Sequence, residues 1–301
     1  GVVVANGICP RYSDIDAWHM AACAIDEAVR NAVAVGGTLE RLAGLDNFCW
    51  CDPVQSEKTP DGHYKLAQLV RANLALYELT RLYGVPCISG KDSMKNDYQI
   101  GDTKISIPPT LLFSVIGRIE DVRKAVTMDA KRAGDFVYVL GETKRELGGS
   151  EWYAMHGFVG NDVPKVDGER ALALYRTLAK AIREGLVASC HDCSDGGRGG
   201  ALAETAFSGG LGMDADLAAV PASGIARDDE ALFSESQSRF VVTVRAEKKA
   251  AFEAALAGST QACIGAVTGD GRFRVKGLKG GVILEEKIED LKEAWQRTLR
   301  F

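Results

Sequence analysis

Apolar residues recur at helical spacing in two long segments of the first half of the chain. The first segment predicts a helix from residue 13 or 14 to about 35, where Gly36 and Gly37 stop it. The second predicts a helix from 66 to 83, which Gly84 ends. Its regularly spaced apolar positions are Leu66, Leu69, Val70, Leu74 and Tyr77.

Short apolar runs between the helices predict strands. In the first half these runs lie at 42–45, 85–89 and 110–117, and residues 2–4 have the pattern of a strand already under way. In the second half we expect strands at 136–140, 186–190, 240–244 and 263–267, and helices at 167–183, through 201–204, at 247–256 and at 288–299. Strands and helices mix without a strict βαβ rhythm, so the pattern predicts an α+β fold.

The 301 residues suffice for two domains, and a charged segment at 120–135 marks the predicted joint. We expect an amino-terminal domain at 1–125 and a carboxy-terminal domain at 133–301. Glycine accounts for 33 residues, which indicates many turns with positive φ or close backbone approaches.

The net charge of −5 argues against a general nucleic-acid binder. The longest uncharged stretch, residues 105–117, has 13 residues and contains two prolines, whereas a membrane-spanning helix needs about 20. No basic-then-apolar signal peptide opens the sequence. The chain begins at Gly1, and we expect a fragment of a longer cytoplasmic polypeptide whose eight cysteines are reduced thiols.

Gly90-Lys91-Asp92-Ser93 follows a predicted strand and carries groups that suit a phosphate. The Walker pattern fails, because Val85 stands where it needs glycine and Asp92 where it needs Ser or Thr. The segment still offers a phosphate the ammonium of Lys91, the hydroxyl of Ser93 and a glycine backbone that can approach the phosphate closely. A plain strand-to-loop turn is the alternative.

The turn His191–Gly197 places two carboxylates and a hydroxyl between a predicted strand and a predicted helix. Asp192, Ser194 and Asp195 offer the oxygen ligands that Mg²⁺ prefers, and a helix N-terminus favours phosphate. The alternative is that Ser194 or Asp195 only caps the helix.

Glu27 and Asn31 lie four residues apart on one face of the first predicted helix, about 6 Å apart along its axis. One Mg²⁺ ion can take an oxygen from each side chain. A solvated helix face that carries Glu27 and Arg30 is the alternative.

The cysteines give a poor match to a zinc site. Cys49-x-Cys51 has an unusual spacing, and about 140 residues separate it from Cys190-x-x-Cys193. A redox pair formed by Cys190 and Cys193 is disfavoured, because the carboxylate of Asp192 between them opposes a low thiol pKa. We therefore interpret the cysteines as buried or unreactive thiols. The sequence also contains no Ser-His-Asp triad that can be assembled and no nucleophile-elbow motif.

Several segments occur in an order that is hard to ascribe to chance. They are Asp46-Asn47-Phe48, Gly90-Lys91-Asp92-Ser93-Met94, Ser106-Ile107-Pro108-Pro109-Thr110-Leu111, Leu147-Gly148-Gly149-Ser150-Glu151, His191-Asp192-Cys193-Ser194-Asp195-Gly196-Gly197 and Leu232-Phe233-Ser234-Glu235-Ser236. With this set, essentially the whole chain resembles the carboxy-terminal synthetase half of the formylglycinamide ribonucleotide amidotransferase family, also called phosphoribosylformylglycinamidine synthase. The wider superfamily includes aminoimidazole ribonucleotide synthetase, selenophosphate synthetase, thiamine-phosphate kinase and a hydrogenase maturation protein.

The resemblance implies a two-domain, aminoimidazole ribonucleotide synthetase-like module of the α+β class. Its first domain is expected to pair through its sheet with that of a second half, forming a barrel, and its second domain is expected to be an α/β sandwich. The implied enzyme is an ATP-dependent carbon–nitrogen ligase of purine biosynthesis. ATP phosphorylates the formamide oxygen of formylglycinamide ribonucleotide, and ammonia from glutamine displaces the phosphate to give formylglycinamidine ribonucleotide. Long family members hold one catalytic site and a second site with bound ADP and Mg²⁺.

The resemblance also assigns roles to residues. Glu27, Asn31 and Asp192 match Mg²⁺ ligands of the auxiliary nucleotide site, and Ser194 matches a nucleotide contact there.

In the short family form, Asp46 and Gly90 match nucleotide contacts and Ser93 matches a substrate contact. Lys91 stands where that form has a metal-ligating Asn. Since an ammonium cannot ligate Mg²⁺, Lys91 is expected to contact phosphate.

The sequence departs from the family in several places. The first synthetase half with the catalytic His, the glutaminase, and the opening strand of the first domain are missing. We therefore expect a fragment that is inactive alone and whose partners are that synthetase half and a glutaminase domain or subunit. Arg198-Gly199-Gly200 replaces apolar residues, which weakens the helix start by up to ~1 kcal/mol per glycine.

Two alternatives stay open. One is a structural nucleotide-binding half without chemistry of its own, and the other is a stand-alone ATPase of the superfamily that acts as a homodimer. Unpaired strand edges and an uncovered apolar sheet face are costly in water, so we expect the fragment to form a homodimer.

Overall fold

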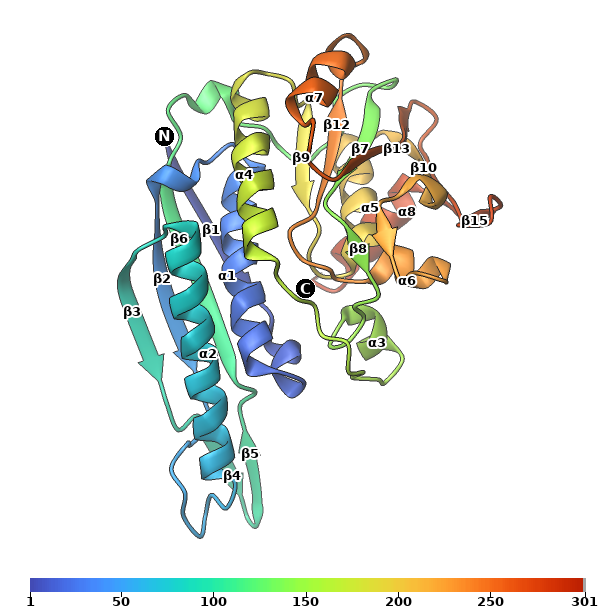
Figure 1. Cartoon of the computed structure of the whole chain (residues 1–301). Helices are drawn as coiled ribbons and strands as arrows, with labels where there is room; N and C mark the ends of the chain where they lie inside the picture. Colours follow the sequence, from blue (N-terminus) through green and yellow to red (C-terminus); the bar gives the residue numbers. More distant parts are fainter. Residues whose placement is uncertain (300–301) are drawn as a thin grey trace. The chain divides into compact units, whose positions relative to one another are not determined.

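The computed structural model describes residues 1–299 and divides the chain into two compact units (Figure 1). Unit 1 comprises Gly1–Ala32, Gly37–Glu120 and Leu147–Leu172. Unit 2 comprises Val33–Gly36, Asp121–Glu146 and the chain from Ala173 onward. Residues 147–172 thus pack with unit 1, although they fall within the range predicted for the second domain.

Unit 1 is a four-stranded sheet with two long helices on one face (Figure 1). In spatial order the strands are β1 (Val2–Ile8), β6 (Thr110–Arg118), β2 (Leu42–Cys49) and β3 (Cys87–Ser93). β6 pairs antiparallel with β1 and β2, and β3 pairs parallel with β2. The helices are α1 (Ala17–Ala34) and α2 (Gly62–Tyr83).

The close packing of α1 on β1 depends on Gly7. A Cβ atom at this position would lie 2.1 Å from the carbonyl oxygen of Ala24, so only glycine permits the approach. The opposite face of the sheet exposes apolar side chains, namely Val2, Val4, Ile8, Leu45 and Ile116. The sheet therefore has one helix-covered face and one open apolar face.

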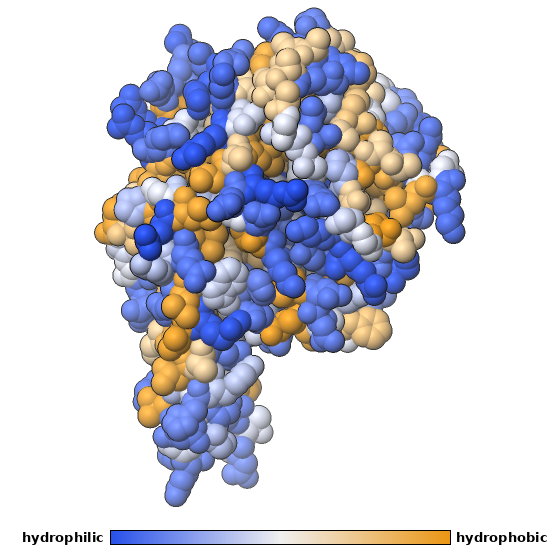
Figure 2. All heavy atoms as spheres, in the orientation of Figure 1, coloured by the Kyte–Doolittle hydropathy of each residue, from blue (hydrophilic) through white to orange (hydrophobic). Residues whose placement is uncertain are grey.

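Helix α2 carries a second apolar surface, on its outward side (Figure 2). The predicted apolar positions Leu66, Val70, Leu74 and Tyr77 are all exposed. The residues of α2 that pack against the unit are instead Lys65, Ala72, Ala75, Leu79 and Tyr83.

Smaller elements complete unit 1. A hairpin of β4 (Asp97–Ile100) and β5 (Thr103–Ser106) follows β3, and α3 (Glu151–Met155) lies in the segment 147–172. Ser150 caps α3, because its Oγ accepts a hydrogen bond from the Tyr153 N–H at 3.2 Å. The glycine-rich turn before it thus opens a short helix.

Unit 2 is built on a seven-stranded sheet (Figure 1). In spatial order the strands are β15 (Val282–Lys287), β14 (Arg272–Lys276), β10 (Gly212–Asp216), β13 (Gln261–Thr268), β7 (Phe136–Leu140), β12 (Phe240–Val244) and β9 (Ser189–Asp192). All neighbours are antiparallel except β10 and β14. The helices are α4 (Gly168–Arg183), α5 (Gly197–Gly209), α6 (Asp228–Phe233), α7 (Lys249–Ala255) and α8 (Ile288–Arg297), and β8 (Thr143–Lys144) pairs with β11 (Ala222–Ser223).

Helices cover both faces of this sheet. Val139 of β7 lies in the core cluster that includes residues of α5 and α8, whereas its neighbour Tyr138 meets the ring of Phe252 in α7. On that second face Phe240 of β12 meets Tyr175 of α4. The arrangement is a three-layer α/β sandwich.

Two predicted strands, 136–140 and 240–244, coincide with β7 and β12. The strand predicted at 85–89 runs further, to Ser93, so Gly90–Ser93 lies in a strand, and its interpretation as a turn is wrong. Within residues 1–299 the sheet of unit 1 is open and no closed barrel forms. Among the described helices, none combines the length and apolar composition needed to cross a lipid bilayer.

Candidate functional site

The predicted site residues fall into two groups, one in each unit. Unit 1 contains Glu27, Asn31, Asp46, Gly90, Lys91 and Ser93. Unit 2 contains Asp192 and Ser194.

Glu27 and Asn31 lie on the side of α1 that meets the backbone of β1. The Ile8 N–H donates a hydrogen bond to Glu27 Oε2 at 2.9 Å, and Asn31 Nδ2 donates to the carbonyl of Asn6 at 3.3 Å. This orientation of the Asn31 amide leaves its Oδ1 as an oxygen ligand. A carboxylate and an amide oxygen from successive turns are a donor set that suits Mg²⁺.

A buried ion pair lies next to this pair of side chains. Arg30 Nη1 lies 2.6 Å from Asp26 Oδ2, and both side chains are fully buried. The Tyr83 hydroxyl at the end of α2 donates to Asp26 Oδ1 at 2.7 Å. The placement of Arg30 on a solvated helix face is therefore wrong, because the arginine links α1 to the end of α2 through Asp26.

Asp46 and Gly90 lie side by side in the register of β2 and β3. A Cβ atom at Gly90 would lie 2.8 Å from Asp46 Oδ1, so the carboxylate rests on the backbone of the glycine. Burial raises the pKa of Asp46, and the negative charge of Asp92 raises it further. A cation or hydrogen-bond donor placed here would stabilise the ionised carboxylate.

Lys91 and Ser93 point to the other face of the sheet. Side chains alternate along a strand, so both lie on the open face, whereas Gly90 faces the helices with Asp46. The Lys91 side chain is exposed and makes no hydrogen bond or ion pair within the described part of the chain. The structure thus brings Asp46 and Gly90 together, but it does not place Lys91 and Ser93 on their side.

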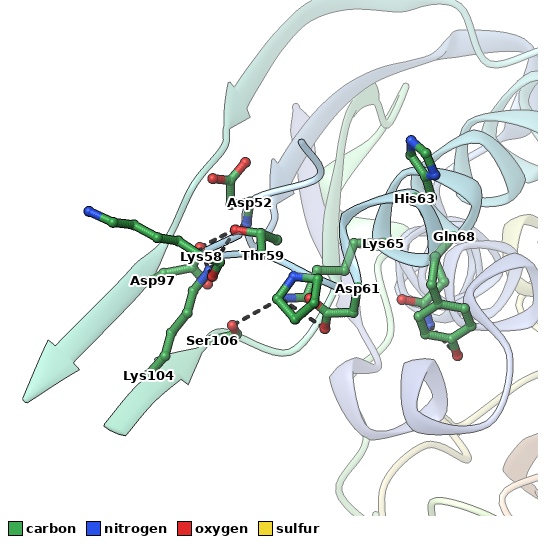
Figure 3. A network of polar contacts seen from close by, with 12 residues as sticks. Asp52, Lys58, Thr59, Asp61, His63, Lys65, Gln68, Asp97, Lys104 and Ser106 are labelled. Carbon is green, nitrogen blue, oxygen red and sulfur yellow. Dashed lines mark hydrogen bonds and ion pairs between the residues drawn. The ribbon is translucent and has the colours of Figure 1, made fainter. Parts of the chain in front are cut away.

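A network of charged and hydroxyl groups lies beyond the end of β3 (Figure 3). Lys104 Nζ lies 3.4 Å from Asp97 Oδ2 and donates to Thr59 Oγ1 at 3.0 Å. Lys65 Nζ lies 3.2 Å from both Asp61 Oδ2 and Ser106 Oγ. The network ties the loop before α2 to the β4–β5 hairpin.

The network also fixes the backbone around Ser93. The Asp52 N–H donates to Asp97 Oδ2 at 3.0 Å, and the Trp50 N–H donates to the Ser93 carbonyl at 2.8 Å. Burial by itself raises the pKa of Asp97, but hydrogen bonds from Ser106, the Asp52 backbone and Lys104 outweigh it and lower the pKa. Asp97 is therefore a charged anchor at neutral pH.

In unit 2 the turn between β9 and α5 is held by one hydrogen bond within the turn and one from a distant carboxylate. Ser194 Oγ donates a hydrogen bond to Asp192 Oδ2, and the Gly196 N–H donates to Glu235 Oε1 at 2.9 Å. The N-cap residue of α5 is Gly196, not Ser194 or Asp195, and the Glu235 carboxylate accepts the hydrogen bond from its N–H. The alternative in which Ser194 or Asp195 is only a helix cap is therefore wrong.

His191 adds a positive charge beside Asp192. Its Nε2 lies 2.6 Å from Glu204 Oε2, and its Nδ1 lies 3.4 Å from Asp192 Oδ1. Burial by itself lowers the pKa of His191, but the contacts with Asp192 and Glu204 outweigh it and raise the pKa to about 9. The imidazole is thus protonated at neutral pH and places a positive charge beside Asp192.

The segment Leu232–Ser236 is held by a buried arginine that sequence reasoning missed. Arg239 is fully buried, and its guanidinium donates to the carbonyls of Ser234 at 2.6 Å and Ser236 at 2.5 Å. It also donates to Thr143 Oγ1 at 2.8 Å. Because Glu235 lies between the two carbonyls, Arg239 positions the carboxylate that accepts from Gly196. The Leu-Phe-Ser-Glu-Ser motif marked this segment in the sequence, but it did not indicate that Arg239 holds it.

Arg198 and Gly199 have a defined packing role at the start of α5. Arg198 is fully buried, and its Nη1 donates to the Ala231 carbonyl at 3.2 Å. A Cβ atom at Gly199 would lie 2.8 Å from the ring of Phe233. The residues that depart from the apolar pattern therefore fit against the same Leu232–Ser236 segment.

The cysteines form no metal cluster in the described residues. No three His, Cys, Asp or Glu side chains of residues 1–299 gather in a way that would hold a metal ion. All eight cysteines are free thiols. Burial raises the pKa of Cys190 well above its ordinary value, and the charge of Asp192 adds to this, which disfavours a reactive thiolate.

Comparison with known proteins gives a domain match in the second half of the chain and relatives along its whole length. Residues 132–277 match the family described as AIR synthase related protein, C-terminal domain. The chain is 34% identical over 303 residues to the phosphoribosylformylglycinamidine synthase subunit PurL of Alkaliphilus metalliredigens, covering 100% of the chain and 38% of that protein. It is 31% identical over 298 residues to PurL of Methanocaldococcus jannaschii, covering 98% of the chain and 39% of that protein. The chain thus spans less than two fifths of the length of these relatives.

Solved structures share the fold. Thermotoga maritima PurL complexed with FGAR matches with a TM-score of 0.78 at 19% identity, over 96% of the chain and 45% of that protein. The hydrogenase maturation protein HypE in complex with ATP matches with a TM-score of 0.70 at 17% identity, over 95% of the chain and 85% of that protein.

The fold and the matched domain define an α+β chain of the AIR synthase-like superfamily. Within that superfamily the chain is a homologue of PurL, the phosphoribosylformylglycinamidine synthase subunit, over its whole length. The family expected from the ordered motifs is confirmed.

Proposed function

We propose that the chain is the carboxy-terminal synthetase half of a formylglycinamide ribonucleotide amidotransferase and that it binds a nucleotide with Mg²⁺. The similarity to PurL over the whole chain carries this proposal. Structures of Thermotoga maritima PurL with FGAR, ADP and ATP support the substrate classes. In the proposed reaction ATP activates the formamide oxygen, and ammonia then displaces phosphate to form the amidine.

Glu27, Asn31 and Asp192 are the proposed Mg²⁺ ligands, and Ser194 is a proposed nucleotide contact. Their support is chemical, because each ligand offers the hard oxygen that Mg²⁺ prefers. Bound Mg²⁺ would neutralise phosphate charge on the nucleotide. The hydrogen bond from Ser194 holds the Asp192 carboxylate in one orientation.

Asp46 and Gly90 are proposed nucleotide contacts, Lys91 a proposed phosphate contact, and Ser93 a proposed substrate contact. Asp46 and Gly90 act from the helix-covered face of the sheet, and Lys91 and Ser93 from the open face. An amino-terminal synthetase half, which is expected to carry the catalytic His, and a glutaminase domain or subunit are the proposed partners. A solved structure of PurLQS from Thermotoga maritima supports assembly with further subunits.

Replacing Asp192 by alanine is expected to weaken Mg²⁺-dependent ATP binding at least ten-fold, because a carboxylate ligand is lost. Titration calorimetry with and without Mg²⁺ measures the change. Asp290→Ala, an exposed carboxylate of α8, is the matched control and should bind as the wild type does. An unchanged affinity in Asp192→Ala would remove Asp192 from the site.

We also propose that the open face of the unit 1 sheet pairs with a second sheet to form a barrel, and that the isolated chain uses a second copy for this. Val4 and Ile116 support the proposal, since they are directly opposite each other in β1 and β6 and are 72% and 47% exposed. An apolar sheet face of this kind is costly in water unless it is covered.

The double variant Val4→Glu, Ile116→Lys is expected to sediment as a 32.2 kDa monomer, whereas the wild type sediments as a dimer of twice that mass. The opposite charges across the strand pair preserve β1–β6 pairing while making the face polar. Val122→Lys, at an exposed apolar residue outside the sheet, is the control and should remain dimeric. A monomeric wild type contradicts the proposal.

A second candidate is a stand-alone superfamily ATPase that acts as a homodimer, and it is favoured by the match to HypE over 85% of that chain. Assays with ATP, formylglycinamide ribonucleotide and ammonia separate the two. Amidine formation only after adding an amino-terminal synthetase half supports the first proposal, and ATP hydrolysis without that substrate supports the second. Near-stoichiometric ADP and Mg²⁺ released on denaturation, without either activity, would support a structural nucleotide-binding half.

A further inference from the structure

A cavity of about 510 Å³ opens in unit 2 where α4 ends. Its walls come from residues 123–126, residues 182–188 and the segment just before α7. Residues 186–188 precede β9, whereas Asp192 is the last residue of that strand. The cavity therefore lies at the opposite end of β9 from the proposed nucleotide contacts of unit 2.

The lining of this cavity is strongly cationic. Its charged side chains are Arg123, Lys124, Lys131, Arg183, Arg245 and Lys248, with Glu184 as the one carboxylate. The chain as a whole carries a net charge of −5, so this is a local reversal of its charge. Cations brought together around one cavity repel each other unless an anion joins them.

Four of the six cations make no direct side-chain contact with a carboxylate, although Arg245 lies near Asp135 and Glu247, and Lys124 lies near Asp121. Arg123 is held by Asp121 through two hydrogen bonds of 2.8 and 2.9 Å, and Lys131 lies 2.5 Å from Asp129. Within residues 1–299 no side-chain hydrogen bond and no ion pair is made by Lys124, Arg183, Arg245 or Lys248. These four come from three separate segments that converge on the cavity.

The end of α4 does not account for this charge. A helix C-terminus carries about half a negative charge, which one cation balances. The last carbonyls of α4 are already satisfied, since the N–H groups of Glu184, Gly185 and Leu186 donate to Lys180, Ile182 and Ala181 at 2.9–3.0 Å. The helix end thus balances at most one of the cations, and Arg183 and Lys248 remain without a carboxylate in contact.

We propose that this cavity binds a small molecule that carries a di- or triphosphate group. Guanidinium and ammonium groups are the side chains that bind phosphate oxygens most strongly. The cavity volume is within the ~300–1,000 Å³ typical of small-molecule sites and exceeds what a single phosphate needs. Buried Ile182 and Val187 give it an apolar floor for the rest of an organic phosphate.

Titration calorimetry with ATP and with inorganic tripolyphosphate tests the proposal. The titrations are done with EDTA and in an Asp192→Ala background, so that Mg²⁺-dependent binding at the other proposed site does not contribute. The double variant Arg183→Glu, Lys248→Glu should bind both probes at least ten-fold more weakly. The matched control Lys276→Glu, Lys279→Glu reverses two exposed lysines of unit 2 that do not line the cavity, and it should stay within two-fold of its background.

The two probes identify the ligand chemistry. Equal affinities for the two probes indicate that the site recognises the polyphosphate group alone. Tighter binding of ATP indicates a site for a nucleoside polyphosphate. Either result supports the proposal, provided that the cavity variant weakens binding and the control variant does not. Two results overturn it, namely no binding of either probe to the chain, or an equal loss in the control pair. Neither result depends on the proposed amidotransferase function, whose test uses Mg²⁺ and Asp192.

Discussion

Replacing Asp26 by alanine is expected to lower the free energy of unfolding by about 3–5 kcal/mol, because the charged Arg30 guanidinium stays buried without that carboxylate. Both side chains are fully buried and 2.6 Å apart. The Tyr83 hydroxyl loses its acceptor in the same variant. Urea unfolding followed by circular dichroism and tryptophan fluorescence measures the change, with the unit 1 transition read from the midpoint shift.

The double variant Asp26→Leu, Arg30→Met provides the control. It removes both charges and fills the space with apolar side chains, so its loss should be much smaller than that of Asp26→Ala. A loss of less than about 1 kcal/mol in Asp26→Ala itself would contradict the expectation, since even one unsatisfied buried polar group costs about that much.

Replacing Arg239 by alanine is expected to destabilise unit 2 by about 3 kcal/mol or more. The variant loses three charge-assisted hydrogen bonds, two to backbone carbonyls and one to Thr143, and leaves a cavity. The Leu232–Ser236 segment is no longer fixed, so Glu235 no longer holds the Gly196 N–H. We therefore expect Mg²⁺-dependent nucleotide binding to fall together with stability.

Arg239→Lys separates charge from geometry in this prediction. Lysine keeps the positive charge but cannot reproduce the planar fork that reaches Ser234, Ser236 and Thr143 together. Its stability should lie between those of the wild type and Arg239→Ala in thermal unfolding. Wild-type stability in Arg239→Ala would show that the segment is held by other contacts.

The fold was predictable from sequence where burial is complete. The continuous apolar runs at 136–140 and 240–244 gave β7 and β12, because strands buried on both faces have no polar positions. β10 reads Gly-Met-Asp-Ala-Asp and has no apolar run, and β15 has only the three-residue run Val-Ile-Leu before Glu-Glu-Lys. These segments are strands because they pair with strands that are distant in the sequence, and such pairing cannot be predicted from the local pattern of residues.

Helix α2 shows a different limit. Periodicity located the helix, but the apolar side it indicated, with Leu66 and Tyr77, is exposed. Small residues such as Ala72 and Ala75 face the sheet, because they allow close packing. A hydrophobic scale counts large exposed side chains more heavily than small buried ones, so it points to the wrong face.

The candidate site was predictable in its chemistry and not in its arrangement. Asp192 and Ser194 are hydrogen-bonded as neighbours in one turn should be. The contact from Glu235 that holds this turn joins residues 39 positions apart, and Arg239 fixes Glu235 partly through Thr143, 96 positions away, so both required the structure. Likewise, the spacing of Gly90 and Lys91 gave no sign that they point to opposite faces of the sheet, since the segment was expected to be a phosphate-binding loop or a plain turn after the strand.

Strand β3 lies at the border of its sheet and pairs with β2 on one side only. Half of its amide hydrogens therefore face away from β2, and amides without a hydrogen-bond partner exchange with deuterated solvent within the shortest labelling times. Docking of another strand on this border would slow exchange at residues 87–93 and leave the amides inside α1 unaffected. Mass spectrometry of peptides from this segment, recorded with increasing protein concentration, would thus follow assembly at the same positions that carry Lys91 and Ser93.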